Sequence, residues 1–228
     1  MKYDNIIQGR FLERANRFIA YVEIDGRTQV CHVKNTGRCR ELLIPNESIV
    51  YVQDHGDCTG RKTRYSLIAV KKNEYLINMD SQAPNRVVYE WISRGAFRDD
   101  VTDVKMEYKY GNSRIDVFFK RGDKSCLMEV KGVTLEDNGV ARFPDAPTER
   151  GVKHVYELIS AVGEGYEAYI MFVVQMKGVK YFEPNDDTHK EFGEALRQAK
   201  KAGVKIIAAD CMVEPDYLAI GDYVNVKL

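Results

Sequence analysis

Residues 113–132 read SRIDVFFKRGDKSCLMEVKG, and they are the most informative part of the sequence. The apolar runs 113–120 and 125–132 predict two strands, and the polar and glycine residues between them are typical of a tight turn. A two-residue loop at Gly122 and Asp123 fixes the register of the hairpin, because the numbers of opposed residues then add to the same total. The sequence therefore predicts a β-hairpin in which the residue opposite each position follows from its number.

Two acids and a lysine meet on one face of this predicted hairpin. The register places Asp116 opposite Glu129, with Cβ atoms roughly 4.5–5.5 Å apart, and the alternation of side chains points Lys131 to the same face. Such a trio can hold a divalent cation and activate a water, as in a phosphodiesterase. The alternative is an ordinary hairpin with solvated polar residues. Apolar neighbours on both faces argue against it, because burying unpaired acids is costly.

The spacing of Asp116 and Glu129-Val130-Lys131 resembles the core of the PD-(D/E)XK nuclease superfamily. Longer motifs closely resemble those of the sugar fermentation stimulation protein A family over nearly the whole chain, which makes this resemblance far more specific than three residues alone. The motifs are Arg14, Asn16-Arg17-Phe18, His32-Val33-Lys34-Asn35-Thr36-Gly37-Arg38, Ala83-Pro84-Asn85-Arg86, Asn112-Ser113-Arg114-Ile115-Asp116, Glu129-Val130-Lys131-Gly132-Val133-Thr134-Leu135, Phe143-Pro144-Asp145-Ala146 and Arg150-Gly151-Val152-Lys153-His154.

The chain is expected to be an α/β protein of mixed α+β type with two domains. Six short predicted strands in residues 1–82 favour an OB-like barrel that binds nucleic acid, as the resemblance also implies. Residues 83–228 begin with a helix and continue with strands and then alternating helices and strands, which implies parallel pairing. We expect a restriction-endonuclease-like mixed sheet flanked by helices there. A capping box at Thr188 and Glu191 is predicted to start the last helix.

The predicted metal site uses oxygen ligands for Mg²⁺ or Mn²⁺. Asp116 and Glu129 are the expected carboxylate ligands, and the backbone carbonyl of Val130 is the expected third ligand. Lys131 is expected to orient the attacking water or to stabilise the charge of the transition state. In the superfamily a glutamine placed like Gln175 touches the nucleophile or the substrate, although a strand-end residue in solvent explains Gln175 equally well.

Two further acids have open roles. Glu90 lies on the first predicted helix, where acids of related nucleases sometimes complete the metal shell, but a solvated surface acid is the favoured reading. Glu107 lies between Lys105 and Lys109, and it either supports the metal or forms a cross-strand ion pair.

Both predicted domains contain positively charged side chains that are suited to contact the phosphate backbone of a nucleic acid. The stretch 133–150 is too long for a simple connector, so we expect a functional loop. Around its end, the cations beside the proposed metal are Arg142, Arg150, Lys153 and His154. A solvated charge explains each of them about equally well, and for His154 the equal alternative is a helix residue that bonds a nearby acid. In the barrel, cations interleave with aromatic residues, of which the arginines are favoured as ligands and the rings as core. These barrel cations are Arg14, Arg17, His32, Lys34, Arg38 and Arg40.

Composition excludes a polybasic or membrane-spanning protein. The 228 residues carry 34 Lys and Arg against 34 Asp and Glu, and the balance is +3 over residues 1–80 and −3 over the rest. This asymmetry suits a first domain that binds a polyanion. No apolar run approaches the roughly 20 residues that span a bilayer, and the N-terminus lacks a signal-peptide pattern. We expect a cytoplasmic protein with no membrane attachment.

We therefore expect a nucleic-acid-binding protein that hydrolyses phosphodiester bonds with Mg²⁺ or Mn²⁺ and has little sequence specificity, because no base-reading helix is evident. The main rival is a non-catalytic DNA-binding regulator of sugar-fermentation (maltose) genes that retains the nuclease fold, as the family resemblance implies. A third possibility is a nuclease-like domain that acts within a larger repair or RNA-processing complex. The two clustered acids favour a catalytic role, because a protein that only binds nucleic acid has no need of acids that repel phosphate. DNA or RNA, single or double strands, endo or exo attack, and monomer or homodimer all stay open.

Overall fold

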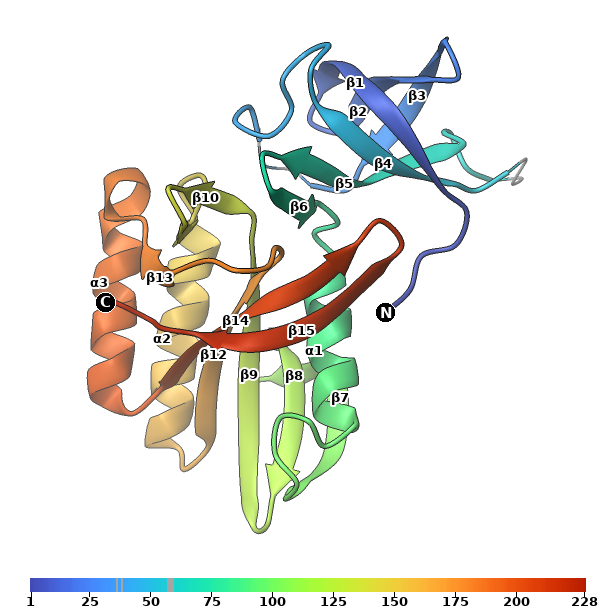
Figure 1. Ribbon diagram of the computed structural model, residues 1–228. Coiled ribbons are helices and arrows are strands. Elements are labelled where there is room, and N and C mark those ends of the chain that lie inside the picture. The colour runs from blue at the N-terminus through green and yellow to red at the C-terminus, as the bar shows by residue number, and fades with distance from the viewer. Residues whose placement is uncertain (36, 38, 57–59) are drawn as a thin grey trace. The chain divides into compact units, whose positions relative to one another are not determined.

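The computed structural model describes residues 1–228 except 36, 38 and 57–59, and the described chain forms two compact units (Figure 1). The first unit comprises Met1–Ala83 together with Gln175–Lys177 and Met212–Ala219. The second comprises Pro84–Val174, Gly178–Cys211 and Ile220–Leu228. Two short segments from the later part of the sequence thus belong with the N-terminal unit.

The N-terminal unit is a closed β-barrel. Its strands run in the order β3-β2-β1-β4-β5-β6, and parallel pairing of β3 with β5 closes the first five. All six predicted strands are confirmed. They are β1 (Ile6–Asn16), β2 (Ile19–Ile24), β3 (Arg27–Val33), β4 (Ile49–Asp54), β5 (Tyr65–Lys72) and β6 (Tyr75–Asn78).

Turn chemistry and close packing explain this barrel locally. Asp25 (φ 49°) and Gly26 (φ 72°) both adopt left-handed conformations between β2 and β3, as a two-residue hairpin turn of the primed type requires. Gly9 on β1 has no such φ, but a Cβ there would lie 2.5 Å from Cγ1 of Val22. Glycine at this position therefore lets the paired strands β1 and β2 lie close together.

The second unit is built on a mixed sheet, as predicted, and its six strands include β15, which the sequence did not predict. The strand order is β15-β14-β12-β9-β8-β7. β12 pairs in parallel with both β9 and β14, and β8 pairs antiparallel with β7 and β9. The elements are α1 (Ala83–Ser93), β7 (Val101–Tyr110), β8 (Ser113–Arg121), β9 (Lys124–Val133), β10 (Leu135–Asp137), β11 (Val140–Phe143), α2 (Glu149–Gly163), β12 (Glu167–Val174), β13 (Tyr181–Pro184), α3 (Asp186–Ala202), β14 (Lys205–Glu214) and β15 (Tyr217–Val224).

Helices cover both faces of this sheet, with α2 and α3 on one side and α1 on the other (Figure 1). Tyr169 and Phe172 are three residues apart on β12, so they point to opposite faces. The Tyr169 ring lies 5.7 Å from that of Phe119, and the Phe172 ring lies 4.1 Å from that of Phe182. The central strands are therefore buried on both sides. None of the described helices is both long and apolar enough to cross a membrane.

The β8–β9 hairpin has the predicted register. Its pairs run from Arg121 opposite Lys124 to Val117 opposite Met128, and each pair gives the predicted total. Residues 126–130 of β9 are all buried, as the apolar neighbours on both faces indicated.

Two predicted features are wrong. The stretch 133–150 is not a loop throughout, because it contains the β10–β11 hairpin, and β11 also pairs in parallel with β13. The capping box at Thr188 and Glu191 is also incorrect. α3 begins at Asp186 after Asn185, and the residue with non-helical dihedral angles inside it is His189 rather than Thr188. The segment that follows β13 thus enters the helix three residues earlier than the pattern indicated.

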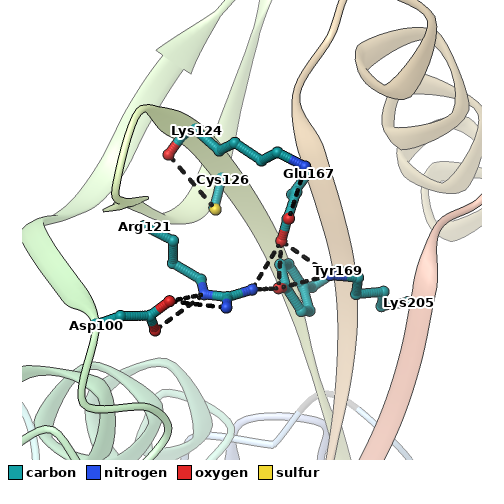
Figure 2. A network of polar contacts seen from close by, with 7 residues as sticks. All are labelled: Asp100, Arg121, Lys124, Cys126, Glu167, Tyr169 and Lys205. Atoms are coloured by element: carbon teal, nitrogen blue, oxygen red, sulfur yellow. Dashed lines mark hydrogen bonds and ion pairs between the residues drawn. The ribbon is translucent and has the colours of Figure 1, made fainter.

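A polar network ties three strands of the sheet together at Glu167 (Figure 2). Oε2 of Glu167 accepts from Arg121 Nη1 at 3.1 Å, Tyr169 Oη at 2.7 Å and Lys205 Nζ at 2.9 Å. Burial alone raises the pKa of Glu167, but these hydrogen bonds and cationic charges outweigh it and lower the pKa to about 2. The network therefore holds an ionised carboxylate at the turn end of the β8–β9 hairpin.

Candidate active site

Asp116 and Glu129 lie on the two strands of the central hairpin. One step beyond the pair Val117 and Met128, the register places Asp116 opposite Glu129, as predicted. Glu129 is buried, with 2% of its surface exposed, while Asp116 is partly buried. Two acids thus face each other in the middle of a sheet.

Asp116 is held by two hydrogen bonds. Asn85 Nδ2 donates to Oδ1 at 2.8 Å, and the backbone N–H of Val130 donates to Oδ2 at 2.8 Å. Burial and the nearby charge of Glu129 nevertheless raise the pKa of Asp116 to about 6. The negative charge of this carboxyl is therefore only partly compensated by the protein, a state that is common at functional sites.

The two carboxylate oxygens of Glu129 differ in their hydrogen bonding. Lys131 Nζ donates to Oε1 at 2.6 Å, and Nδ1 of His154 contacts the same oxygen. Oε2 is buried and has no hydrogen-bond partner among the residues that the structure describes. Burial raises the pKa of Glu129, but the hydrogen bond from His154 and the charge and hydrogen bond of Lys131 outweigh it, so the pKa is lowered. Glu129 is ionised with one oxygen available.

Helix α2 brings His154 to Glu129. The helix begins after Thr148, whose Oγ1 accepts from the backbone N–H of Gly151 at 3.1 Å, which is the usual N-cap bond. His154 is buried on the inner face of α2, and Arg150 one turn earlier donates from Nε to His154 Nε2 at 3.2 Å. Arg150 was predicted to contact phosphate or to be a solvated charge, and His154 to contact phosphate or to bond a nearby acid; the structure shows the second of these for His154. In the structure they form a chain of contacts that ends at Glu129.

The residues present fit a hard divalent cation. A buried carboxylate oxygen without a partner lies beside a second acid whose charge is only partly compensated, and such oxygens are the ligands that Mg²⁺ prefers. Among the described residues no group of three or more His, Cys, Asp or Glu is arranged to hold a metal. Further ligands would therefore be the predicted Val130 carbonyl, waters or substrate oxygens, which is common for Mg²⁺. The Val130 N–H is already used by Asp116.

Gln175 belongs to the N-terminal unit. It follows β12, is 2% exposed, and donates from Nε2 to the backbone oxygens of Asn78 at 3.0 Å and of Asp80 at 3.1 Å. These contacts give Gln175 a role in fixing the chain after β6. Its predicted contact with the nucleophile or substrate stays a prediction.

Two other candidates pair with neighbouring side chains, and a third is exposed. Arg142 on β11 donates from Nε to Glu183 Oε1 at 2.8 Å. Glu90 forms i,i+4 ion pairs with Arg86 at 3.4 Å and Arg94 at 3.9 Å. Glu107 is exposed on β7 with φ 53°.

Two barrel cations predicted to bind nucleic acid make intramolecular contacts. Arg14 donates to the backbone oxygens of Gly37 at 2.6 Å, Asn35 at 2.6 Å and Arg17 at 2.8 Å. Lys34 Nζ lies 2.7 Å from Oδ2 of the buried Asp80. Both side chains thus stabilise the chain after β3.

The other barrel cations differ in exposure. Arg17 and Arg40 are exposed, and the Arg17 guanidinium lies 6.0 Å from the centre of the Phe18 ring. His32 is partly buried, and burial followed by the charges of Arg61 and Lys34 lowers its pKa. Arg38 lies outside the described residues. Phe11 is core, as favoured, whereas Phe18 is 50% exposed.

Asn85 is a site residue to which the sequence assigned no role. It lies at the start of α1, and its amide reaches Asp116 on β8. The only signal was its place in the motif Ala83-Pro84-Asn85-Arg86. Spacing could not reveal the contact, because it joins residues 31 apart in the sequence.

A closed barrel followed by a mixed sheet that carries Asp116, Glu129 and Lys131 defines a two-domain protein of OB and PD-(D/E)XK-like fold. The profile described as "SfsA N-terminal OB domain" matches residues 12–79, and the profile described as "Sugar fermentation stimulation protein RE domain" matches residues 82–217. The chain belongs to the sugar fermentation stimulation protein family, so the resemblance is confirmed.

Relatives match over essentially the full length. The sugar fermentation stimulation protein homolog of Clostridium beijerinckii is 59% identical, and the match covers 100% of this chain and 100% of the homolog. The homolog of Desulfitobacterium hafniense strain Y51 is 57% identical over 100% of this chain and 99% of its own. Among solved structures, Pyrococcus furiosus SfsA in complex with Ca²⁺ is 27% identical, with a TM-score of 0.89 over 100% of this chain and 98% of its own.

Proposed function

We propose that this protein is a metal-dependent phosphodiesterase that cleaves nucleic acid with little sequence specificity, using Mg²⁺ or Mn²⁺. One observation carries the proposal: Oε2 of Glu129 is buried without a hydrogen-bond partner among the described residues, beside Asp116 and Lys131. A protein that only binds nucleic acid gains nothing from a buried and a partly buried acid side by side, because they repel phosphate and are costly to bury.

Asp116 and Glu129 would hold the cation, with the Val130 carbonyl as a third ligand. The bound cation would polarise the phosphodiester and lower the pKa of water. The protein's own part is to keep both carboxylates in place. Asn85 and the Val130 N–H hold Asp116, and Lys131 with His154 holds Oε1 of Glu129.

Lys131 would act on the reacting phosphate. Its ammonium lies 2.6 Å from Glu129 Oε1, and the side chain is 15% exposed, so it can still face the substrate. A cation fixed at this place can orient the attacking water and offset the negative charge that develops in the transition state.

The barrel would supply binding rather than chemistry. Its exposed cations, Arg17 and Arg40, suit phosphate contacts that do not depend on base sequence. The OB description of this region supports binding of nucleic acid, since such barrels often bind single strands. For the metal, the Ca²⁺ complex of the Pyrococcus furiosus relative supports a hard cation with oxygen ligands.

The test uses the pure protein with labelled single- and double-stranded DNA and RNA, in Mg²⁺, Mn²⁺ or EDTA. We expect metal-dependent cleavage that is lost in Glu129→Gln and Lys131→Ala and kept in Glu194→Gln, which changes an exposed acid on α3. Binding without cleavage in every metal would contradict the proposal and favour the DNA-binding regulator of sugar-fermentation genes.

A further inference from the structure

The imidazole of His154 lies between a guanidinium and a carboxylate. Arg150 Nε donates to His154 Nε2 at 3.2 Å, and His154 Nδ1 contacts Oε1 of Glu129. The histidine side chain is only 9% exposed. Both ring nitrogens are therefore engaged inside the protein, and neither is available to a phosphate from solvent.

The chemistry of Arg150 fixes the tautomer of this ring. An arginine side chain has donors and no acceptor, so Nε2 of His154 must accept the hydrogen bond and carries no proton. The ring proton then lies on Nδ1, which donates to Glu129 Oε1. A contact with arginine on one side thus determines which nitrogen meets the carboxylate on the other.

The chain of contacts determines which oxygen of Glu129 stays available. Oε1 receives Nδ1 of His154 and Nζ of Lys131. Oε2 is then left on the other side of the carboxylate, buried and with no hydrogen-bond partner within the described part of the chain. We propose that His154, with its tautomer set by Arg150, is a positioning residue that orients Glu129 so that Oε2 faces the cation.

This inference rests on the proposed function and names two positioning residues for its metal ligand. Hydrogen bonds of this kind, made behind the ligands of a metal, typically alter affinity by about 10–100-fold when removed.

The first turn of α2 is built to hold Arg150 in place. Arg150 and His154 are four residues apart, so they lie on one face of the helix. At Gly151, between them, a Cβ would come within 2.8 Å of Thr148 Oγ1, the N-cap acceptor. Glycine at this position lets Thr148 close the helix end, and the closed end fixes the turn that carries Arg150.

The first experiment compares two amide replacements of His154 by calorimetric titration with Ca²⁺ and Mn²⁺. The amide nitrogen of asparagine can take the place of Nδ1 and donate to Glu129, whereas the longer glutamine extends toward the place of Nε2. We expect His154→Asn to bind within a few-fold of wild type and His154→Gln to bind about 10–100-fold more weakly. Equal affinity of His154→Gln and wild type would overturn the proposal.

The second experiment reads the tautomer directly by ¹⁵N NMR of the histidine side chains. The chain has only 4 histidines. The ¹⁵N signals that disappear in His154→Asn therefore belong to the imidazole ring of His154. In the wild type we expect a protonated Nδ1 and an unprotonated Nε2, and in Arg150→Met a shift toward the other tautomer with weaker Ca²⁺ binding. Lys153→Met is the matched control, since Lys153 is exposed on the same helix turn and pairs with Glu157; it should change neither.

The outcomes separate this proposal from the one it rests on. Metal binding that depends on Asp116 but not on His154 would leave the proposed function standing and overturn the positioning role. A wild-type protein that binds neither Ca²⁺ nor Mn²⁺ would overturn both. A protonated Nε2 in the wild type would overturn the role of Arg150, whatever the metal affinity.

Discussion

The backbone N–H of Val130 donates to Oδ2 of Asp116 at 2.8 Å. The residue next to Glu129 in the chain therefore holds the opposing acid, and the two carboxylates stay close although their charges repel. The raised pKa of Asp116 measures the consequence, because burial and the charge of Glu129 both disfavour its ionised form. Without a bound cation, ionised Asp116 therefore lowers the stability of the fold, whereas the lowered pKa of Glu129 acts in the opposite direction.

Asp116→Asn should stabilise the protein at pH 8 in EDTA. The pKa of Asp116 rises from 3.8 to about 6 in the folded state, which corresponds to about 3 kcal/mol. Since the folded-state pKa lies above the unfolded value, wild-type stability falls as pH increases from about 4 through about 6. Asparagine does not ionise, so it avoids this loss; its oxygen can accept from the Val130 N–H, and Asn85 can turn its amide to accept from the new Nδ2. We therefore expect the melting temperature to rise by several degrees.

The same variant should lose Ca²⁺ binding, and its advantage in melting temperature should vanish at pH 4, where wild-type Asp116 is protonated. A variant that is less stable than wild type at pH 8 would show that the two acids do not repel each other as the structure indicates. Thermal unfolding at pH 4, 6 and 8 checks the prediction.

Lys131→Ala should abolish cleavage while leaving affinity for nucleic acid nearly unchanged. The ammonium contacts Glu129 Oε1 at 2.6 Å in a site with few exposed atoms, so it contributes little to the surface that attracts a polyanion. Single-turnover cleavage and filter binding on the same substrate separate the two effects. Equal loss of rate and affinity would move Lys131 from chemistry to binding.

Glu167→Gln should destabilise the second unit at neutral pH by about 1–2 kcal/mol, less than the pKa shift alone implies, because solvent partly screens the ion pairs. The pKa of Glu167 is lowered to about 2. Its contribution is therefore complete above about pH 4.5 and is lost as pH falls toward 2. Urea unfolding at pH 7 and pH 3 should show a smaller difference from wild type at pH 3. Lys124→Gln, which removes only the 3.5 Å contact to Glu167, should have a weaker effect.

The hairpin that carries the site was predictable because its signals are local. A Gly122-Asp123 turn and period-two alternation fix the register within twenty residues, and the register brings the acids together. The β10–β11 hairpin also has a turn signal, Asn138-Gly139, and both residues adopt left-handed φ values. It was missed because its strands contain only 3 and 4 residues, and β11 is completed by β13 from a distant part of the chain.

The contacts that complete the site could not be predicted from the spacing of residues along the sequence. His154 meets Glu129 only because α2 packs on the sheet, and Gln175 finds partners 97 residues away. Sequence supplies the residue types at such positions, whereas tertiary packing decides which of them meet. This is why the sequence left His154 open between phosphate and a nearby acid, whereas the fold gives it Glu129 and Arg150 as partners.

Arg17→Ala should weaken binding of single-stranded nucleic acid of any sequence and flatten its salt dependence, if the barrel contacts the backbone. Arg17 is exposed beside Phe18 in the turn after β1, whereas Arg10 on β1 donates to both oxygens of Glu23, at 3.1 and 2.9 Å, and is the matched control. Each phosphate contact contributes about 0.7 to the slope of log affinity against log salt for single strands. We expect Arg17→Ala to reduce the slope by about that amount and Arg10→Ala to leave it nearly unchanged. Fluorescence anisotropy between low and moderate salt measures both slopes, and an unchanged slope in Arg17→Ala would remove this part of the barrel from the binding surface.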